Sequence, residues 1–221
     1  PKNIKAASIS TFVSNQLNLE NIYPFCKDPL KFIFFENLKS NFIPFEKFIN
    51  SLINECNNLT SVWESRTTKK GFQSKGNLFK LQTPSIVNLK NIIFERINEY
   101  KIKYKAKSDG FISQWPNKFS LLGWYNKLLK HGYQQSHIHP GGWLSGCFYL
   151  KMPRQLKKSE GAINFGLHGY DYPIENSDIP SYQYTPVEGD LVLFPSSLFH
   201  KTLPFSSNDE RHVIAFDIIP E

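Results

Sequence analysis

The chain has 221 residues, 40% of them apolar and 20% charged, a composition typical of a globular protein large enough for one domain with a sizeable core. No apolar run approaches the length of a membrane span and no signal peptide is recognisable, so neither a membrane protein nor a secreted one is expected. The formal net charge is +7, but no run of lysines and arginines is long enough to indicate nucleic-acid binding. We interpret the surplus charge as a solvated lysine-rich surface, with attraction of an anionic partner or cosubstrate as the alternative.

The cysteines indicate the compartment. Cys26, Cys56 and Cys147 are odd in number, widely spaced and without a CxxC pair, which argues against a disulfide framework and against a zinc ribbon. We therefore expect a protein of the reducing cytoplasm.

The first half of the chain predicts helices with little strand. Residues 1–30 lack clear periodicity and are expected to form an extended arm lying on the domain. Residues 31–35 (KFIFF) predict a short strand, and helices with one apolar stripe each are predicted over 44–57 and 84–105. Residues 60–76 are polar and basic, so we expect a loop there, and it is the best candidate for a mobile flap.

From about Phe111 the apolar period changes to two, which indicates strands. The predicted strands are Ser120–Asn126, Gln134–His139, Trp143–Lys151, Ala162–Leu167, Asp190–Pro195 and Arg211–Ile219. Short strands separated by turn residues favour a double-sheet jelly roll, and the preceding helices make the fold class α+β, mainly β. We expect a single domain over 1–221, with an extended arm (1–30), a helical support region (31–110) and a jelly-roll core (111–221).

Histidines carry the clearest chemical signal. His137 and His139 stand at i and i+2 of a predicted strand and so point to the same face. His200 closes a later apolar stretch, residues 191–200. Three imidazoles brought together from two strands can hold one metal ion and leave coordination positions open for small molecules.

An arginine is predicted to share the interior with these histidines. If His137 and His139 point inward, the next strand places Ser145, Cys147 and Tyr149 on the inner face. The inner face of the last strand would carry Arg211, Val213, Ala215 and Asp217. A guanidinium inside a barrel is costly unless it meets an anion, and its planar fork suits a carboxylate. A metal together with a carboxylate ligand is the simplest explanation.

Four segments carry a family resemblance: HIHPGGWLSGCFYL, EGAINF, EGDLVLFPSSLFH and ERHVIAFD. In order and spacing they resemble the iron(II)- and 2-oxoglutarate-dependent oxygenases, and within these the bacterial and phage group related to prolyl hydroxylases. The resemblance covers about residues 73–221. It implies a double-stranded β-helix, a jelly roll with N-terminal helices packed on the major sheet.

The resemblance also implies a metal site made of a His-x-Asp/Glu pair and a distal histidine. His137 matches the first histidine and His200 the distal one. His139 stands where many members carry the carboxylate, which is a departure. It either completes a three-histidine site or stands aside for water or another residue, with Asp171 and His168 as fallback donors.

Three further residues match the cosubstrate site of this family. Arg211 matches the arginine that pairs with the C5-carboxylate of 2-oxoglutarate, Tyr149 matches a tyrosine that adds a hydrogen bond, and Asn126 is a weaker candidate for the same pocket. The alternatives are a core tyrosine with a satisfied hydroxyl and, for Arg211, a salt bridge at the barrel rim with Glu210 or Asp209.

The implied activity is that of a dioxygenase that uses Fe(II), 2-oxoglutarate and O2, releases succinate and hydroxylates its substrate. No catalytic residue beyond the metal ligands is expected. Halogenation is disfavoured because His139 is too bulky to leave room for a halide. Two rivals remain: a 2-oxoglutarate-independent dioxygenase with a three-histidine iron site, and a noncatalytic metal-binding jelly-roll module.

The substrate is expected to be a small molecule or a peptide rather than nucleic acid or membrane. Lys69, Lys70 and Lys75 on the predicted flap would make a basic entrance that favours an acidic substrate. His168, Tyr170 and Asp171 are candidates for lining the substrate pocket, because polar and aromatic side chains crowd there.

Overall fold

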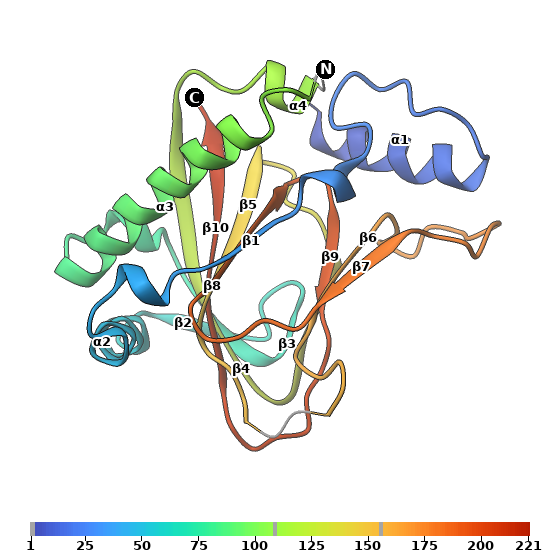
Figure 1. Cartoon of the computed structure of the whole chain (residues 1–221). Helices are drawn as coiled ribbons and strands as arrows, with labels where there is room; N and C mark the ends of the chain where they lie inside the picture. Colours follow the sequence, from blue (N-terminus) through green and yellow to red (C-terminus); the bar gives the residue numbers. More distant parts are fainter. Residues whose placement is uncertain (1–2, 108–109, 155–156) are drawn as a thin grey trace.

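The computed structural model describes residues 3–107, 110–154 and 157–221 (Figure 1). Its helical segments are α1 (Ile4–Gln16), η1 (Pro29–Phe32), η2 (Lys39–Asn41), α2 (Phe45–Asn57), η3 (Leu78–Lys80), α3 (Pro84–Lys103) and α4 (Gly110–Ser113). Its strands are β1 (Phe34–Asn37), β2 (Ser61–Trp63), β3 (Thr68–Ser74), β4 (Phe119–His137), β5 (Leu144–Lys151), β6 (Ile163–Gly166), β7 (Ser181–Tyr184), β8 (Asp190–Pro195), β9 (Phe199–Thr202) and β10 (Arg211–Pro220).

The strands form one curled sheet in which every pairing is antiparallel. Its order is β1-β8-β5-β10-β4-β9-β6-β7, and the β2–β3 hairpin adds to β4. Strand β4 links the two halves of the curl, because its first part pairs with β10 and its end pairs with β9. The mainly-β jelly roll expected from the sequence is confirmed.

Helices cover one face of the curl, as Figure 1 shows for α3 in front of β10 and β5. The predicted apolar stripe of α3 is buried in one core cluster with Phe148, Ile214 and Phe216, the outward residues of β5 and β10. The Tyr100 hydroxyl donates to the carbonyl of Phe32 at 2.7 Å, which ties α3 to the segment before β1. Both predicted helices are confirmed, with bounds of 45–57 and 84–103.

A second cluster fills the inside of the curl. It comprises Tyr149, Met152, Ile163, Phe165, Leu167, Val192, Phe194, Leu198 and Val213. The alternation predicted for β5 and β10 is therefore confirmed: one set of side chains faces the helices and the other faces the interior. Within the described residues, no helix has the length and apolar character needed to cross a membrane.

The expectation of an extended arm over residues 1–30 is wrong, because Ile4–Gln16 is the helix α1. Asn3 caps it by accepting a hydrogen bond from the backbone N–H of Ala6 at 3.0 Å. The buried face of α1 consists largely of small and polar side chains, Ala7, Ser8 and Thr11 among them. Such a face shows no clear helical periodicity of apolar residues in the sequence, so the helix was not predicted.

The expectation of a loop over residues 60–76 is also wrong, because the segment contains the β2–β3 hairpin, and its role as a flap stays a prediction. Its ladder to β4 begins at Thr68, which faces Gln134, and continues beyond Gly71, which faces Leu128. A Cβ at Gly71 would lie 2.6 Å from the carbonyl oxygen of Lys127, so only glycine permits this close approach.

Three strand assignments also change. The strand expected over residues 31–35 lies at Phe34–Asn37, after a 3-10 turn. The two strands expected over 120–126 and 134–139 are the single strand β4, which ends at His137. The apolar stretch that ends near His200 is divided between β8 and β9 by a turn.

Candidate metal centre

Three histidines converge where β4 meets β9. His137, the last residue of β4, lies directly opposite His200 in the ladder between these strands, and His139 follows two residues later. One ligand nitrogen from each ring lies within 4.8 Å of the others. In the described part of the chain, this is the only group of three His, Cys, Asp or Glu residues with that geometry.

Hydrogen bonds fix which nitrogen of each ring is free to bind a metal. His137 Nδ1 lies 2.7 Å from the carbonyl of Gln135, and His200 Nδ1 lies 3.1 Å from the carbonyl of Leu198. Because a carbonyl can only accept, each Nδ1 carries the proton, and the lone pair of Nε2 is left for a metal.

His139 is oriented in the same way by a carboxylate. Its Nδ1 lies 2.6 Å from Oδ1 of Asp217 in β10. Ser145 donates to the same carboxylate oxygen at 2.7 Å and lies 2.8 Å from the hydroxyl of Ser196. The Asp217 side chain is only 8% exposed, so this charge is held close to the histidines with little solvent screening.

Burial keeps two of these rings neutral. Desolvation, and next the neighbouring His139, lower the pKa of His137 to about 4. Desolvation, and next the neighbouring histidines, lower the pKa of His200 well below its usual range. Both rings are therefore unprotonated at neutral pH, the state in which imidazole binds metals.

A second group of polar side chains lies beside the histidines, and several of its buried polar atoms make no hydrogen bond with the described residues. Arg211 is 2% exposed, and its guanidinium stands over the ring of Tyr149 at 5.1 Å from the ring centroid. Among the described residues, Arg211 Nε, the Tyr149 hydroxyl and Asn126 Oδ1 are buried without a hydrogen-bond partner. Burial lowers the pKa of the Arg211 guanidinium. An anion would satisfy this group.

The alternatives left open for these two residues are contradicted. Glu210 pairs with Lys127 and His212, Asp209 accepts from the backbone N–H of Arg154, and among the described residues neither carboxylate forms an ion pair with Arg211. The hydroxyl of Tyr149 has no partner in the described chain, unlike that of a satisfied core tyrosine.

A small cavity joins the two groups. Its lining is Trp124, Asn126, Gln134, His137, His139, Cys147, Tyr149, Ile163, His200, Thr202, Arg211, Val213 and Ala215. The candidate metal ligands and the unpaired guanidinium therefore face one space. One bound diacid could chelate a metal ion at the histidines with one end and place a carboxylate at Arg211 with the other. The residues present therefore fit a metal ion together with such a diacid.

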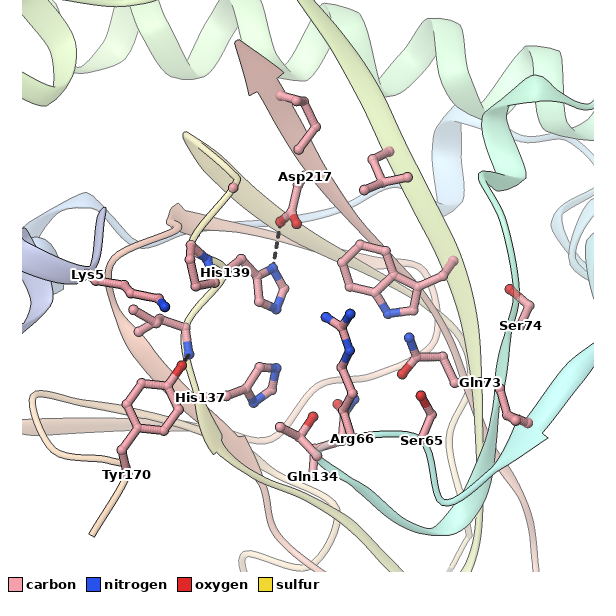
Figure 2. A pocket seen from close by; sticks show the side chains of 18 of the residues that line it. Lys5, Ser65, Arg66, Gln73, Ser74, Gln134, His137, His139, Tyr170 and Asp217 are labelled. Carbon is pink, nitrogen blue, oxygen red and sulfur yellow. Dashed lines mark hydrogen bonds and ion pairs between the residues drawn. The ribbon is translucent and has the colours of Figure 1, made fainter. Parts of the chain in front are cut away.

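A larger cavity of about 950 Å³ opens on His137 and His139 (Figure 2). Of the three residues predicted to line a substrate pocket, Tyr170 lines this cavity, whereas His168 and Asp171 do not. His168 instead makes a hydrogen bond to the carbonyl of Tyr172, and neither fallback donor belongs to the histidine group.

The cations at the entrance of this cavity differ from the predicted Lys69, Lys70 and Lys75. Lys75 lines the cavity, whereas Lys69 and Lys70 do not. The cations that join Lys75 are Arg66, from the turn of the hairpin, and Lys5, from α1.

Sequence reasoning missed the roles of two residues of the site, Asp217 and Trp124. Asp217 was placed on the inward face, but its pairing with His139 depends on how the end of β10 lies against the segment after β4, which no local pattern encodes. Trp124 was also missed, although its ring lies 5.4 Å from that of His139. Inward position on a strand next to the histidines was the available signal for both.

One protein-family model matches the part of the chain that carries the site. Residues 123–217 match the family described as "Putative 2OG-Fe(II) oxygenase". This stretch runs from β4 to β10 and contains the three histidines and Arg211. No curated protein matches the chain.

Solved structures of prolyl hydroxylases share the fold. One from Trichoplax adhaerens, in complex with a peptide fragment of the hypoxia inducible factor oxygen degradation domain, has a TM-score of 0.57 at 14% identity and covers 97% of this chain and 90% of its own. A Pseudomonas putida prolyl-4-hydroxylase has a TM-score of 0.56 at 13% identity, with 86% and 92% covered. A viral collagen prolyl hydroxylase from Paramecium bursaria Chlorella virus-1, in complex with 2-oxoglutarate, has a TM-score of 0.55 at 14% identity, with 86% and 97% covered.

Proposed function

We propose that this chain is an iron(II)- and 2-oxoglutarate-dependent oxygenase, in which His137, His139 and His200 hold the iron and Arg211 holds the cosubstrate. The observation that carries this proposal is the arrangement of hydrogen bonds around the three rings. Each Nδ1 is engaged by an oxygen of the protein, so three Nε2 lone pairs are left beside a cavity that contains an unpaired guanidinium.

Iron(II) and 2-oxoglutarate, when bound, supply the oxidative chemistry: with O2, the cosubstrate is converted to succinate and CO2, and an oxygen atom is added to a C–H bond of the substrate. The protein orients and encloses these groups. Arg211 would pair with the distal carboxylate of 2-oxoglutarate, and the hydroxyl of Tyr149 and the side chain of Asn126 would complete its hydrogen bonds. Val213, Ala215 and Ile163 line the same cavity and would keep water from the site.

Asp217 would compensate for the missing carboxylate ligand. An imidazole at position 139 leaves the iron one negative charge short of the usual His-x-Asp/Glu arrangement. The carboxylate of Asp217, whose Oδ1 lies 2.6 Å from His139 Nδ1, would place a negative charge beside the ring. This charge would make the imidazole a stronger electron-pair donor to the metal. We assign Asp217 a positioning role.

The two rival functions explain less of the structure. A dioxygenase that needs no 2-oxoglutarate, or a noncatalytic metal-binding module, leaves the buried guanidinium of Arg211 without an anion. The substrate would be a small molecule or a peptide, and hydroxylation would be the outcome. The whole chain would act as one oxygenase domain.

The test is succinate release from 2-oxoglutarate by protein loaded with iron under anaerobic conditions and then exposed to O2. We expect His200→Ala to abolish metal binding and succinate release. Arg211→Gln should raise the KM for 2-oxoglutarate by tenfold or more (about 1.5–3 kcal/mol for a hydrogen bond to a charged group). His131→Asn, at an exposed histidine far along β4 from the site, is the matched control. Full activity in both His200→Ala and Arg211→Gln would overturn the proposal.

A further inference from the structure

The larger cavity carries an excess of positive charge. Its charged lining residues are Lys5, Arg66, Lys75 and Asp217. The carboxylate of Asp217 is already engaged by His139 and Ser145. The three cations come from α1, from the turn of the β2–β3 hairpin and from the end of that hairpin, so the fold collects them from separate segments.

The turn that carries Arg66 is fixed by backbone hydrogen bonds. The N–H of Thr68 donates to the carbonyl of Ser65 at 2.8 Å, and the N–H of Gln135 in β4 donates to the carbonyl of Thr67 at 2.9 Å. Arg66 itself has a left-handed backbone, with φ of +45°. The neighbouring Glu64 and Lys70 share this left-handed conformation, so it belongs to the shape of the turn that presents Arg66.

Nothing in the described chain neutralises these cations. The nearby carboxylate of Glu64 accepts from the N–H of Lys70 at 3.0 Å, within the hairpin. None of Lys5, Arg66 and Lys75 forms an ion pair or a side-chain hydrogen bond with any described residue. Figure 2 shows the Arg66 guanidinium pointing into the cavity beside Gln73, with Lys5 reaching in from the side of Tyr170.

The remaining lining suits the body of a small organic molecule. Trp124, Val62 and Leu122 offer an aromatic and apolar surface, and Tyr170 offers a polar handle. A cavity of about 950 Å³ with a few convergent polar groups is typical of a small-molecule site. One sign of charge in such a cleft concentrates ligands of the opposite sign.

We propose that this cavity selects substrates that carry a phosphate or carboxylate group, which Arg66 binds with the help of Lys5 and Lys75 while the body of the substrate extends toward the histidines. The inference rests on the proposed function, since it makes this cavity the substrate site. The fork of Arg66 would bind the anion bidentately.

Calorimetric titration of the iron-loaded, anaerobic protein with saturating 2-oxoglutarate tests the proposal, because the cosubstrate then occupies Arg211. The probes are 1-naphthyl phosphate, 1-naphthoate and the neutral 1-naphthol. We expect at least one acid to bind about tenfold or more tightly than the alcohol, and Arg66→Gln to abolish that preference. Lys69→Gln, in the same hairpin but outside the cavity, should leave the preference unchanged.

A second set of probes, a phosphoserine peptide and its serine counterpart, separates a free small acid from an acid carried on a peptide. Tighter binding of an acid than of its neutral counterpart in either set supports the proposal. Equal affinity of acid and neutral probe in both sets, or equal losses of affinity in Arg66→Gln and Lys69→Gln, would overturn it. Succinate release without added substrate is measured in parallel, and its absence would remove the oxygenase function without changing the binding result.

Discussion

His139 Nδ1 lies 2.6 Å from Oδ1 of Asp217, so the imidazole that we propose as the third metal ligand is itself paired with a carboxylate from the last strand. We expect Asp217→Asn to weaken iron binding by about tenfold to a hundredfold, because the amide oxygen can still accept from Nδ1 while the charge is lost. Anaerobic titration with Fe(II) measures this. Ser145→Ala removes one hydrogen bond to Asp217 but no charge, and should have a smaller effect. Unchanged affinity in Asp217→Asn would exclude the positioning role.

Restoring the usual carboxylate at position 139 should fail unless Asp217 changes as well. In His139→Asp two carboxylates would share one buried site, and like charges at short range oppose ionisation of both. We expect the single variant to bind Fe(II) at least tenfold more weakly than the double variant His139→Asp/Asp217→Asn. A double-mutant cycle of iron affinities measures the coupling. Additive effects would show that the two positions act independently.

The histidine pair and the inward arginine could be predicted because both follow from local rules. Alternation along a strand places His137 and His139 on one face, and it places Arg211 with Val213 on the interior of β10. The pairing of β4 with β9 could not be predicted from local rules. His200 lies in a separate short strand after a turn, and only the assembled sheet places it opposite His137.

The errors in the first third of the chain have a physical cause. Helix α1 is buried through small and polar groups, so its contacts depend on the loop it packs against and not on a hydrophobic stripe. The β2–β3 hairpin is polar because it lies at the edge of the sheet, where backbone hydrogen bonds to β4 can hold it without much apolar burial. Composition alone reads such segments as coil.

The metal-free protein should lose stability as the pH falls from about 6.5 to about 4. Folded His137 has a pKa of about 4, below the value near 6.5 of the unfolded chain, so between these values the unfolded state binds more protons. The contribution is complete above pH 6.5 and amounts to ~3 kcal/mol, at ~1.4 kcal/mol per pKa unit. The lowered pKa of His200 acts in the same direction.

Urea unfolding of the metal-free protein at a series of pH values measures this dependence. Carboxylates also titrate in this range, so the comparison is with His137→Gln, which lacks the titrating ring. We expect the variant to show a shallower fall in unfolding free energy between about pH 6.5 and 4. Parallel curves for the two proteins would contradict the assignment of His137 as a buried neutral imidazole.

Gln16, at the end of α1, should control the wall of the larger cavity. Its side-chain oxygen accepts from the backbone N–H groups of Glu175 and Asn176 at 2.8 and 2.9 Å, and its amide donates to the carbonyl of Asn176 at 2.9 Å. The same helix packs Phe12 against the ring of Tyr172, which lines the cavity. Gln16→Ala would remove these hydrogen bonds, each of which contributes about 0.5–1.5 kcal/mol at most where water can reach the backbone.

Hydrogen exchange at the amides of Glu175 and Asn176 reports this loss directly. We expect their protection to fall by about tenfold or more in Gln16→Ala, because the segment that follows Tyr172 would open locally without unfolding of the sheet. Protection in β5 and β10 should be unchanged. Ser14→Ala in the same helix is the control, since its hydroxyl makes none of these contacts. If both variants lose protection equally, α1 stabilises the cavity wall only through general packing, and the specific role of Gln16 is excluded.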